Sequence, residues 1–229
     1  MSRKNKLQRF AEIGSFPNVY ENFNMQQPEL SGVNGQVVDL KGKWNELHFK
    51  NDNRIVLELA CGRGEYTLDL AEAHPDINII GVDIKGARIW RGATNALERN
   101  LTNAAFLRIR IEQISLFFAP DEVSEIWITF PDPFLRESKA NRRLTSAYFI
   151  EQYRKILKKG GLVHLKTDEI NLYNFSLEVL EADPKCQIFY KDDDIYSKEL
   201  PFPELATKTY YEEMHRKKGK TIKYIRFGI

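Results

Sequence analysis

"RIVLELACGRGEYTLDLAEAHPDINIIGVD" runs from Arg54 to Asp83 and decides the fold. It contains two short apolar runs, 54–60 and 77–83, of the kind found in strands that are buried on both faces. Between them a glycine turn leads into a segment, 65–75, that reads as a helix. A strand, a helix and a second strand in this order predict a right-handed βαβ unit.

The same alternation continues to the end of the chain. It predicts an α/β fold with a mostly parallel, seven-stranded sheet and helices on both faces. Thr145 is the predicted N-cap of the helix at 145–159, and Gly160 and Gly161 are its predicted stop. Strands are expected at 54–60, 77–83, 104–109, 125–130, 161–168, 186–191 and 221–227. Helices are expected at 65–75, 84–101, 112–118 (one turn), 145–159 and 169–183.

Composition limits the class of protein. The 229 residues favour one large domain, and the polar, irregular residues 1–50 read as an N-terminal extension that packs on it. No apolar run approaches the roughly 20 residues of a membrane span. The start, "MSRKNKLQRF", lacks the apolar core of a secretory signal, so we expect a cytoplasmic protein. Two cysteines and four histidines show no zinc or disulfide spacing, so we expect no metal.

Polar side chains stand at the ends of five successive predicted strands. They are Glu58, Asp83, Glu112, Asp132 and Asp168. In an open α/β sheet the ligand binds beyond the carboxyl ends of the strands, close to the point where the strand order reverses. The five residues are therefore the first candidates for a binding site.

The glycine turn indicates which ligand binds there. Gly62 and Gly64 let the backbone approach a ligand closely, and the Asp83 carboxylate can bind both hydroxyls of a ribose. A dinucleotide motif would have a third glycine where this chain has Thr67, which counts against NAD. S-adenosylmethionine carries a sulfonium and an ammonium that suit Glu58. The residues thus favour a methyltransferase over other nucleoside binders, and a tight turn without a ligand is the alternative.

A second stretch, "FPDPFLRESKANRRL" at 130–144, holds an aspartate between two prolines. Pro131 and Pro133 restrict the backbone, so Asp132 stands on a stiff loop that a basic strip follows. Positive charge also gathers near both chain ends, from Arg3, Lys4, Lys6 and Arg9 and from 216–226, although the net charge is only +2. This clustering is compatible with a nucleic-acid partner, and an ordinary solvated surface is the alternative.

"FPDPFLRESKANRRL", "HLKTD" and "TYYEE", behind "LELACGRGEY", resemble the bacterial tRNA (guanine-N7-)-methyltransferases. That family modifies guanosine 46 in the variable loop of tRNA. The likeness covers about Lys41 to the end of the chain. It implies a Rossmann-like class I methyltransferase domain over 51–229, S-adenosyl-L-methionine as methyl donor, S-adenosyl-L-homocysteine as product, and tRNA as partner.

The resemblance also assigns roles to residues. Asp132 would be the active-site acid. The methyl donor would contact Glu58, Asp83, Glu112 and Asp132, beside the loop of Gly62 and Gly64. The target guanosine would be bound by Arg136, Asp168, and the segment from Thr209 to Glu212. The tRNA would contact Ser138, Lys139, Asn141, Arg142 and Arg143. The chain departs from the family pattern at Ala60 and Cys61 (usually a glycine), Glu112 (aspartate), Phe134 (tryptophan) and Arg136 (lysine).

The chemistry agrees with this assignment. Guanine N7 has a lone pair and no proton, so its methylation needs alignment more than a general base. A fixed carboxylate can stabilise the cation that forms, or accept hydrogen bonds from the N1 and N2 edge. We expect direct in-line transfer without a metal or a covalent intermediate. A non-catalytic RNA-binding subunit and a small-metabolite methyltransferase are the alternatives, and a monomer and a homodimer are both open.

Overall fold

The computed structural model describes residues 5–24 and 26–229 and is built around one ten-stranded sheet. The strand order is β3-β2-β1-β6-β5-β4-β7-β8-β10-β9. Across the sheet, the consecutive strands β1, β6, β5, β4, β7 and β8 are all parallel to their neighbours in this series. Strand β10 is antiparallel to both of its neighbours. The strands are β1 (Val19–Glu21), β2 (Leu30–Ser31), β3 (Val37–Val38), β4 (Arg54–Leu59), β5 (Ile77–Val82), β6 (Ala104–Arg108), β7 (Val123–Thr129), β8 (Leu157–Thr167), β9 (Gln187–Asp192) and β10 (Lys223–Gly228).

The seven strands expected from the sequence are confirmed as β4 to β10. The chain runs outward from β4 through β5 to β6 and then returns to the other side of β4 with β7. The strand order therefore reverses between β4 and β7, which is where an open α/β sheet binds its ligand. Every residue of β5 is buried, which explains its uninterrupted apolar run.

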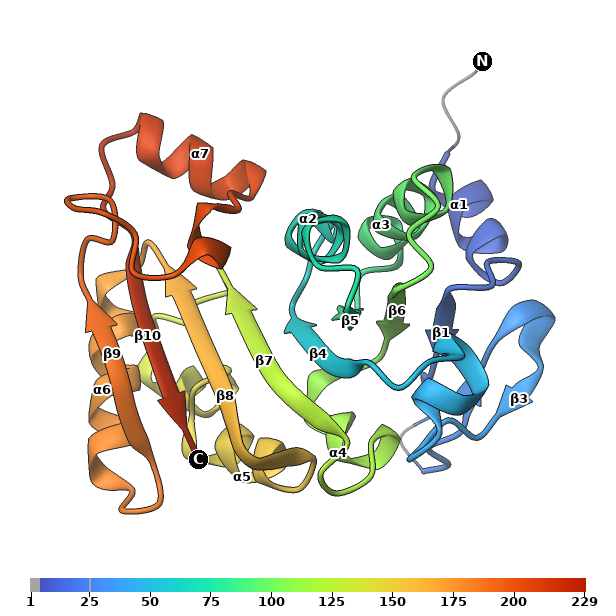
Figure 1. Ribbon diagram of the computed structural model, residues 1–229, viewed down its shortest axis with the longest axis horizontal. Helices are drawn as coiled ribbons and strands as arrows, with labels where there is room; N and C mark the ends of the chain where they lie inside the picture. Colours follow the sequence, from blue (N-terminus) through green and yellow to red (C-terminus); the bar gives the residue numbers. More distant parts are fainter. Residues whose placement is uncertain (1–4, 25) are drawn as a thin grey trace.

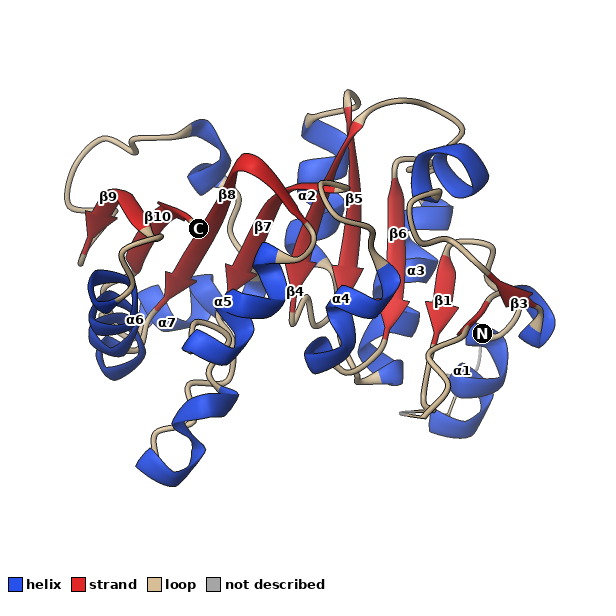
Figure 2. Cartoon of the chain, turned by 90° about the horizontal axis from the view of Figure 1, so that it is seen from below, coloured by secondary structure: helices blue, strands red, loops and turns tan. Residues whose placement is uncertain are grey.

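Helices cover both faces of the sheet, as predicted. Figure 1 shows α1, α2, α3 and α7 on one face and α4, α5 and α6 on the other. The buried apolar side chains form two clusters, one for each face. The helices are α1 (Lys6–Ile13), α2 (Glu65–Ala73), α3 (Gly86–Glu98), α4 (Ile114–Phe117), α5 (Ala147–Arg154), α6 (Ile170–Ala182) and α7 (Tyr210–Lys217). Figure 2 shows the same sheet from below, with its strands side by side.

The helix expected at 145–159 is shorter than predicted. It ends as α5 at Arg154, and β8 already begins at Leu157, which pairs with Val123 of β7. Burial of Leu157 in the sheet outweighs the helical pattern, and Gly160 instead has a positive φ of 78° within an irregular part of β8. The N-cap position is Ser146 and not Thr145, whose hydroxyl is buried against Ser176 Oγ at 2.6 Å.

The N-terminal residues are more regular than expected. β1 pairs in parallel with β6 and so extends the main sheet, and α1 lies against α3, where Trp90 Nε1 donates to Glu12 Oε2 at 2.8 Å. Arg3 and Lys4 of the predicted basic cluster lie outside the described residues. The domain boundary at residue 50 stays a prediction. Among the helices in the described part of the chain, none has the length and apolar character required to cross a membrane.

Candidate active site

Three neighbouring cavities open where the parallel strands end. The Asp83 cavity has a volume of about 380 Å³, the Glu58 cavity about 50 Å³ and the Asp168 cavity about 320 Å³. Arg88 and Phe130 line all three, and Asp132 lines both large ones. The structure thus brings the five predicted strand-end residues to one edge of the sheet.

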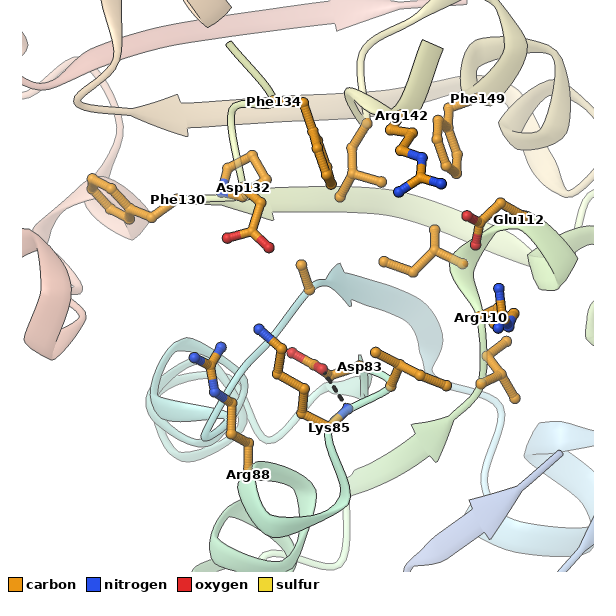
Figure 3. A pocket seen from close by; sticks show the side chains of 16 residues that line it. Asp83, Lys85, Arg88, Arg110, Glu112, Phe130, Asp132, Phe134, Arg142 and Phe149 are labelled. Atoms are coloured by element: carbon orange, nitrogen blue, oxygen red, sulfur yellow. Dashed lines mark hydrogen bonds between the residues drawn. The ribbon is translucent and has the colours of Figure 1, made fainter. Parts of the chain in front are cut away.

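The Asp83 cavity is lined by three of the predicted donor contacts, namely Asp83, Glu112 and Asp132. Figure 3 shows the carboxylate of Asp132 and the guanidinium of Arg142 directed toward the cavity, with Asp83 and Lys85 on the opposite wall. Its volume lies within the range of small-molecule sites, roughly 300–1,000 Å³. The cavity is therefore large enough for a nucleoside ligand.

Asp83 is held rigidly by the backbone of two loops. Its Oδ2 accepts a hydrogen bond from Gly62 N at 3.0 Å, and its Oδ1 accepts one from Lys85 N at 2.7 Å. An ionised carboxylate has about four acceptor positions, so each oxygen keeps one for a ligand. Asp83 is thus oriented to accept hydrogen bonds from two adjacent hydroxyls.

The loop after β4 has a run of positive φ angles. They are 58° at Ala60, 59° at Gly62 and 69° at Gly64. At Gly64 a Cβ atom would lie 2.5 Å from Phe106 Cε1, so this glycine is required by packing against β6. Gly64 does not line any of the three cavities, whereas Gly62 lines the Glu58 cavity. Donor contact by either glycine stays a prediction.

Glu58 is only 1% exposed and supports the loop from below. One carboxylate oxygen accepts from the backbone N–H (2.9 Å) and the hydroxyl of Thr67, and the other accepts from the Thr129 hydroxyl at 2.6 Å. Burial raises the pKa of Glu58 to about 7, although these hydrogen bonds act in the opposite direction. Glu58 therefore links the start of α2 to the end of β7, and its predicted contact with the donor is untested.

Asp132 is exposed on the loop that leaves β7. The residues on either side of the Pro131–Asp132–Pro133 segment both have positive φ, 48° at Phe130 and 43° at Phe134. Because large L residues rarely adopt this conformation, the loop is strained as well as stiffened by its prolines. The strain shows that the surrounding structure constrains this loop, and the rigid placement of Asp132 itself stays a prediction.

In the Asp168 cavity, the carboxylate already has partners on α7 and just beyond it. Asp168 Oδ2 lies 3.0 Å from His215 Nδ1 and is also paired with Lys220 Nζ. The rings of His215 and Phe130 are within 6° of parallel, with their centroids 6.4 Å apart. A planar carboxylate site beside two parallel rings is suited to a flat base with N–H donors on one edge.

Helix α7 was not predicted from the sequence. Two of the predicted substrate contacts, Thr209 and Glu212, lie at its start, and they differ in whether they reach a cavity. Thr209 is the N-cap of α7, accepts from Glu212 N at 3.2 Å and lines the Glu58 cavity. Glu212 is fully buried and lines none of the three cavities. Its Oε1 lies 2.9 Å from Lys166 Nζ and accepts from Tyr196 Oη at 2.6 Å. In this arrangement Glu212 fastens α7 to the sheet, and guanosine contact would require α7 to shift.

The basic strip after Asp132 divides into two groups. Arg136, Ser138, Lys139, Asn141 and Arg142 are exposed on or beside the short 3₁₀ helix η4 (Glu137–Arg142), and of these only Arg142 lines a cavity. Arg143 is only 5% exposed, and its guanidinium donates to the carbonyl oxygens of Pro133 and Phe134. This differs from the sequence prediction, because in this structure the Arg143 guanidinium faces the Asp132 loop and not the surface where tRNA would bind. The other RNA contacts stay predictions.

Comparison with known proteins shows the family of this chain. Residues 52–225 match the family described as "Putative methyltransferase". The tRNA (guanine-N(7)-)-methyltransferase of Christiangramia forsetii is 48% identical over all of this chain and all of its own. The chain belongs to this family. The enzyme of the same name from Bacteroides thetaiotaomicron is 47% identical over 99% of this chain and 86% of its own.

Solved structures support the fold alone. The 16S rRNA (adenine(1408)-N(1))-methyltransferase of Catenulisporales acidiphilia covers 84% of this chain and 94% of its own, with a TM-score of 0.59 and 14% identity. This likeness confirms the Rossmann-like methyltransferase fold. The two proteins share this fold although only 14% of their aligned residues are identical.

Several residues that shape the site were not identified from the sequence. Thr67 and Thr129 bind Glu58, Lys166 binds Glu212, and His215 Nδ1 lies 3.0 Å from Asp168 Oδ2. Thr129 and Lys166 each lie near the end of a strand, two or three residues before a predicted site residue, and that position is a usable signal. His215 lies 47 residues from its partner in a helix that was not predicted, so no local pattern could have indicated the contact.

Proposed function

We propose that this protein transfers a methyl group from S-adenosyl-L-methionine to N7 of guanosine 46 in the variable loop of tRNA. One observation carries the proposal: Asp132 stands on the wall that the Asp83 cavity shares with the Asp168 cavity. A donor in the first cavity and a guanine in the second would meet at this carboxylate. Methyl transfer between them needs mainly this alignment.

The methyl donor, S-adenosyl-L-methionine, fits the Asp83 cavity. The two hydroxyls of its ribose match the free acceptor positions of Asp83, and the apolar side chains of Ile84, Ile109 and Ile111 offer a surface for the adenine. Glu112 lines the same wall, where the adenine-side contact is expected. The sulfonium would then face Asp132 and the loop at Ala60. The donor supplies an electrophilic methyl group and leaves as S-adenosyl-L-homocysteine.

The acceptor base fits the Asp168 cavity. Asp168 would accept hydrogen bonds from the N1 and N2 edge of guanine once His215 and Lys220 release it, and Phe130 offers a ring for stacking. N7 then needs no proton removed, and Asp132 stabilises the positive charge that develops on the ring. Burial raises the pKa of the Cys61 thiol well above its usual value, so Cys61 is not a ready nucleophile, which supports direct transfer.

The tRNA body would contact the basic strip and α7. Arg136, Ser138, Lys139, Asn141 and Arg142 present an exposed, largely cationic surface beside the Asp83 cavity, and Arg216 to Lys220 present another beside the Asp168 cavity. Contacts of this kind bind phosphate and make affinity fall with salt. A tRNA-modifying role also agrees with the expected cytoplasmic location, which stays a prediction, as does the choice between monomer and homodimer.

The test is to incubate unmodified tRNA with the protein and radiolabelled S-adenosyl-L-methionine, digest the tRNA, and identify the labelled nucleoside. Label in 7-methylguanosine that disappears when guanosine 46 is replaced supports the proposal. Label in another nucleoside refutes the assignment of the guanine to the Asp168 cavity. Donor binding without any label supports the alternative, a non-catalytic RNA-binding subunit.

Asp132 is tested with Asp132→Asn, which keeps the shape and removes the charge. We expect turnover to fall by about tenfold or more, because a fixed charge near the developing cation is lost. Because Asp132 acts as an orienting charge and not as a base, no new carboxylate-type pH dependence should appear. Full activity of this variant would remove Asp132 from the mechanism.

A further inference from the structure

Two adjacent arginines at the end of the basic strip point in opposite directions. Arg142 is exposed, and its guanidinium is directed into the Asp83 cavity (Figure 3). Arg143 is buried on the other side of the chain, behind the loop that carries Asp132. In this arrangement only Arg142 is placed to bind phosphate, and Arg143 needs a separate explanation.

The guanidinium of Arg143 binds two consecutive carbonyl oxygens of the Asp132 loop. Nε donates to Pro133 O at 3.2 Å and to Phe134 O at 3.3 Å, and Nη2 donates to Phe134 O at 3.2 Å. The same group lies 4.3 Å above the centre of the Phe175 ring on α6. A planar, charged fork that stacks on an aromatic ring has little freedom, so it fixes the carbonyls in place.

This loop requires such a restraint. Phe130 and Phe134 bracket Asp132 and both have positive φ, and strained backbone of this kind persists only where the surroundings enforce it. On the Phe130 side, the sheet supplies the restraint, because Phe130 N donates to Lys166 O on β8 at 2.8 Å. On the Phe134 side, the chain has left the sheet, and the Arg143 side chain supplies the hydrogen bonds that restrain the backbone.

The backbone of Arg143 is itself firmly anchored. Its carbonyl accepts from Ser146 N at 2.9 Å at the start of α5, and the carbonyl of Leu144 accepts from Tyr153 Oη at 2.9 Å. The next residue, Thr145, is bound to Ser176 on α6 at 2.6 Å. The exposed helix η4 can therefore meet a ligand while Arg143 keeps its place.

We propose that Arg143 is a positioning residue that holds the Asp132 carboxylate in its working geometry, while Arg142 alone of the pair contacts RNA. The inference rests on the proposed function, in which Asp132 faces the donor and the target base. It predicts that loss of the Arg143 guanidinium affects turnover through Asp132 and leaves the affinity for tRNA unchanged.

The experiment compares Arg143→Met, Arg143→Lys and Arg142→Met at saturating donor, over a range of tRNA and salt concentrations. Arg143→Met should lower kcat by about tenfold or more, because small misplacements of a reacting group are costly. Its KM for tRNA and the salt dependence should match the wild type. Arg143→Lys keeps one charged donor, so it should recover part of kcat, and it carries the test if Arg143→Met does not fold. Arg142→Met should instead raise the KM for tRNA and reduce the salt slope by about 1.

The same substitutions are then made in Asp132→Asn. If Arg143 acts through Asp132, Arg143→Met should cost less than about threefold in that background, because the two effects are coupled. An equal loss in both backgrounds would show a general structural role and overturn the inference, as would a fully active Asp132→Asn. A reduced salt slope for Arg143→Met would overturn it in favour of an RNA contact. Failure of the wild type to label 7-methylguanosine would refute the proposed function separately.

Discussion

Ala60 stands at the one left-handed position of the loop after β4 that lacks a glycine. Its φ is 58°, close to the 59° of Gly62. In this conformation the Cβ of an L residue crowds the following carbonyl oxygen, at a cost of about 1–2 kcal/mol. Ala60→Gly removes that cost, although the added freedom of the unfolded chain offsets about 0.4–1 kcal/mol. We therefore expect the free energy of unfolding to rise by about 0.5–1 kcal/mol.

The assay is urea unfolding, supported by thermal unfolding. For a chain of this length, a gain of about 0.5–1 kcal/mol raises Tm by about 1–4 °C. The matched control is Ala11→Gly, at an exposed position within helix α1, where the backbone is right-handed. There the same substitution should lower the free energy of unfolding by about 0.5–1 kcal/mol.

The opposite signs of the two substitutions are the decisive result. If Ala60→Gly destabilises the protein as Ala11→Gly does, the left-handed strain at Ala60 is not the dominant effect and the reasoning is refuted. Ala60 also lines the Asp83 and Glu58 cavities, so affinity for S-adenosyl-L-homocysteine is measured alongside. Loss of one methyl contact should change that affinity by no more than about 1 kcal/mol.

Three further predictions concern buried groups. Burial raises the pKa of Glu58 to about 7 from its usual 4.5, so its contribution to stability is full below about pH 4.5 and is lost as the pH rises to about 7. The free energy of unfolding should fall by about 3 kcal/mol over this range. In Glu58→Gln, urea unfolding should show a free energy of unfolding that depends less on pH. Lys166→Met should lower the free energy of unfolding by about 3–5 kcal/mol, because it leaves the charge of the fully buried Glu212 unpaired. The double variant Lys166→Met, Glu212→Met should lose less stability, and an equal loss in both variants would contradict the pairing. Gly64→Ala should cost about 1–3 kcal/mol through contact with Phe106, and Phe106→Leu should relieve part of it, as thermal unfolding would show.

The fold was predictable because its signals are local. Apolar residues predominate in β4, β5 and β7, as burial on both faces of the sheet requires. The prediction failed where the signal depended on distant partners. β1 has three residues and becomes a strand by pairing with β6, about ninety residues away, and α7 is held by Lys166 of β8.

The candidate site was predictable in its residues and less so in their directions. The strand-end carboxylates of Asp83, Asp132 and Asp168 do line the cavities. Glu58 was chosen by the same reasoning and Glu212 and Arg143 by the family resemblance, and the structure buries all three. A sequence motif records which residue types stand together along the chain, but not which side of the chain each one faces.

The sequence by itself determined the order of strands β4 to β10 and of helices α2 to α6, the strand ends that carry acids, the stiffness of the Pro131–Asp132–Pro133 loop and the family. These properties depend on neighbours along the chain, through periodicity, backbone restriction and motif spacing. The tertiary structure alone decided that Arg142 faces the cavity and Arg143 the loop, and that Glu212 is bound to Lys166. Those outcomes depend on which polar groups the fold brings into contact with each charged side chain. A buried charge is stable only where such groups bind it.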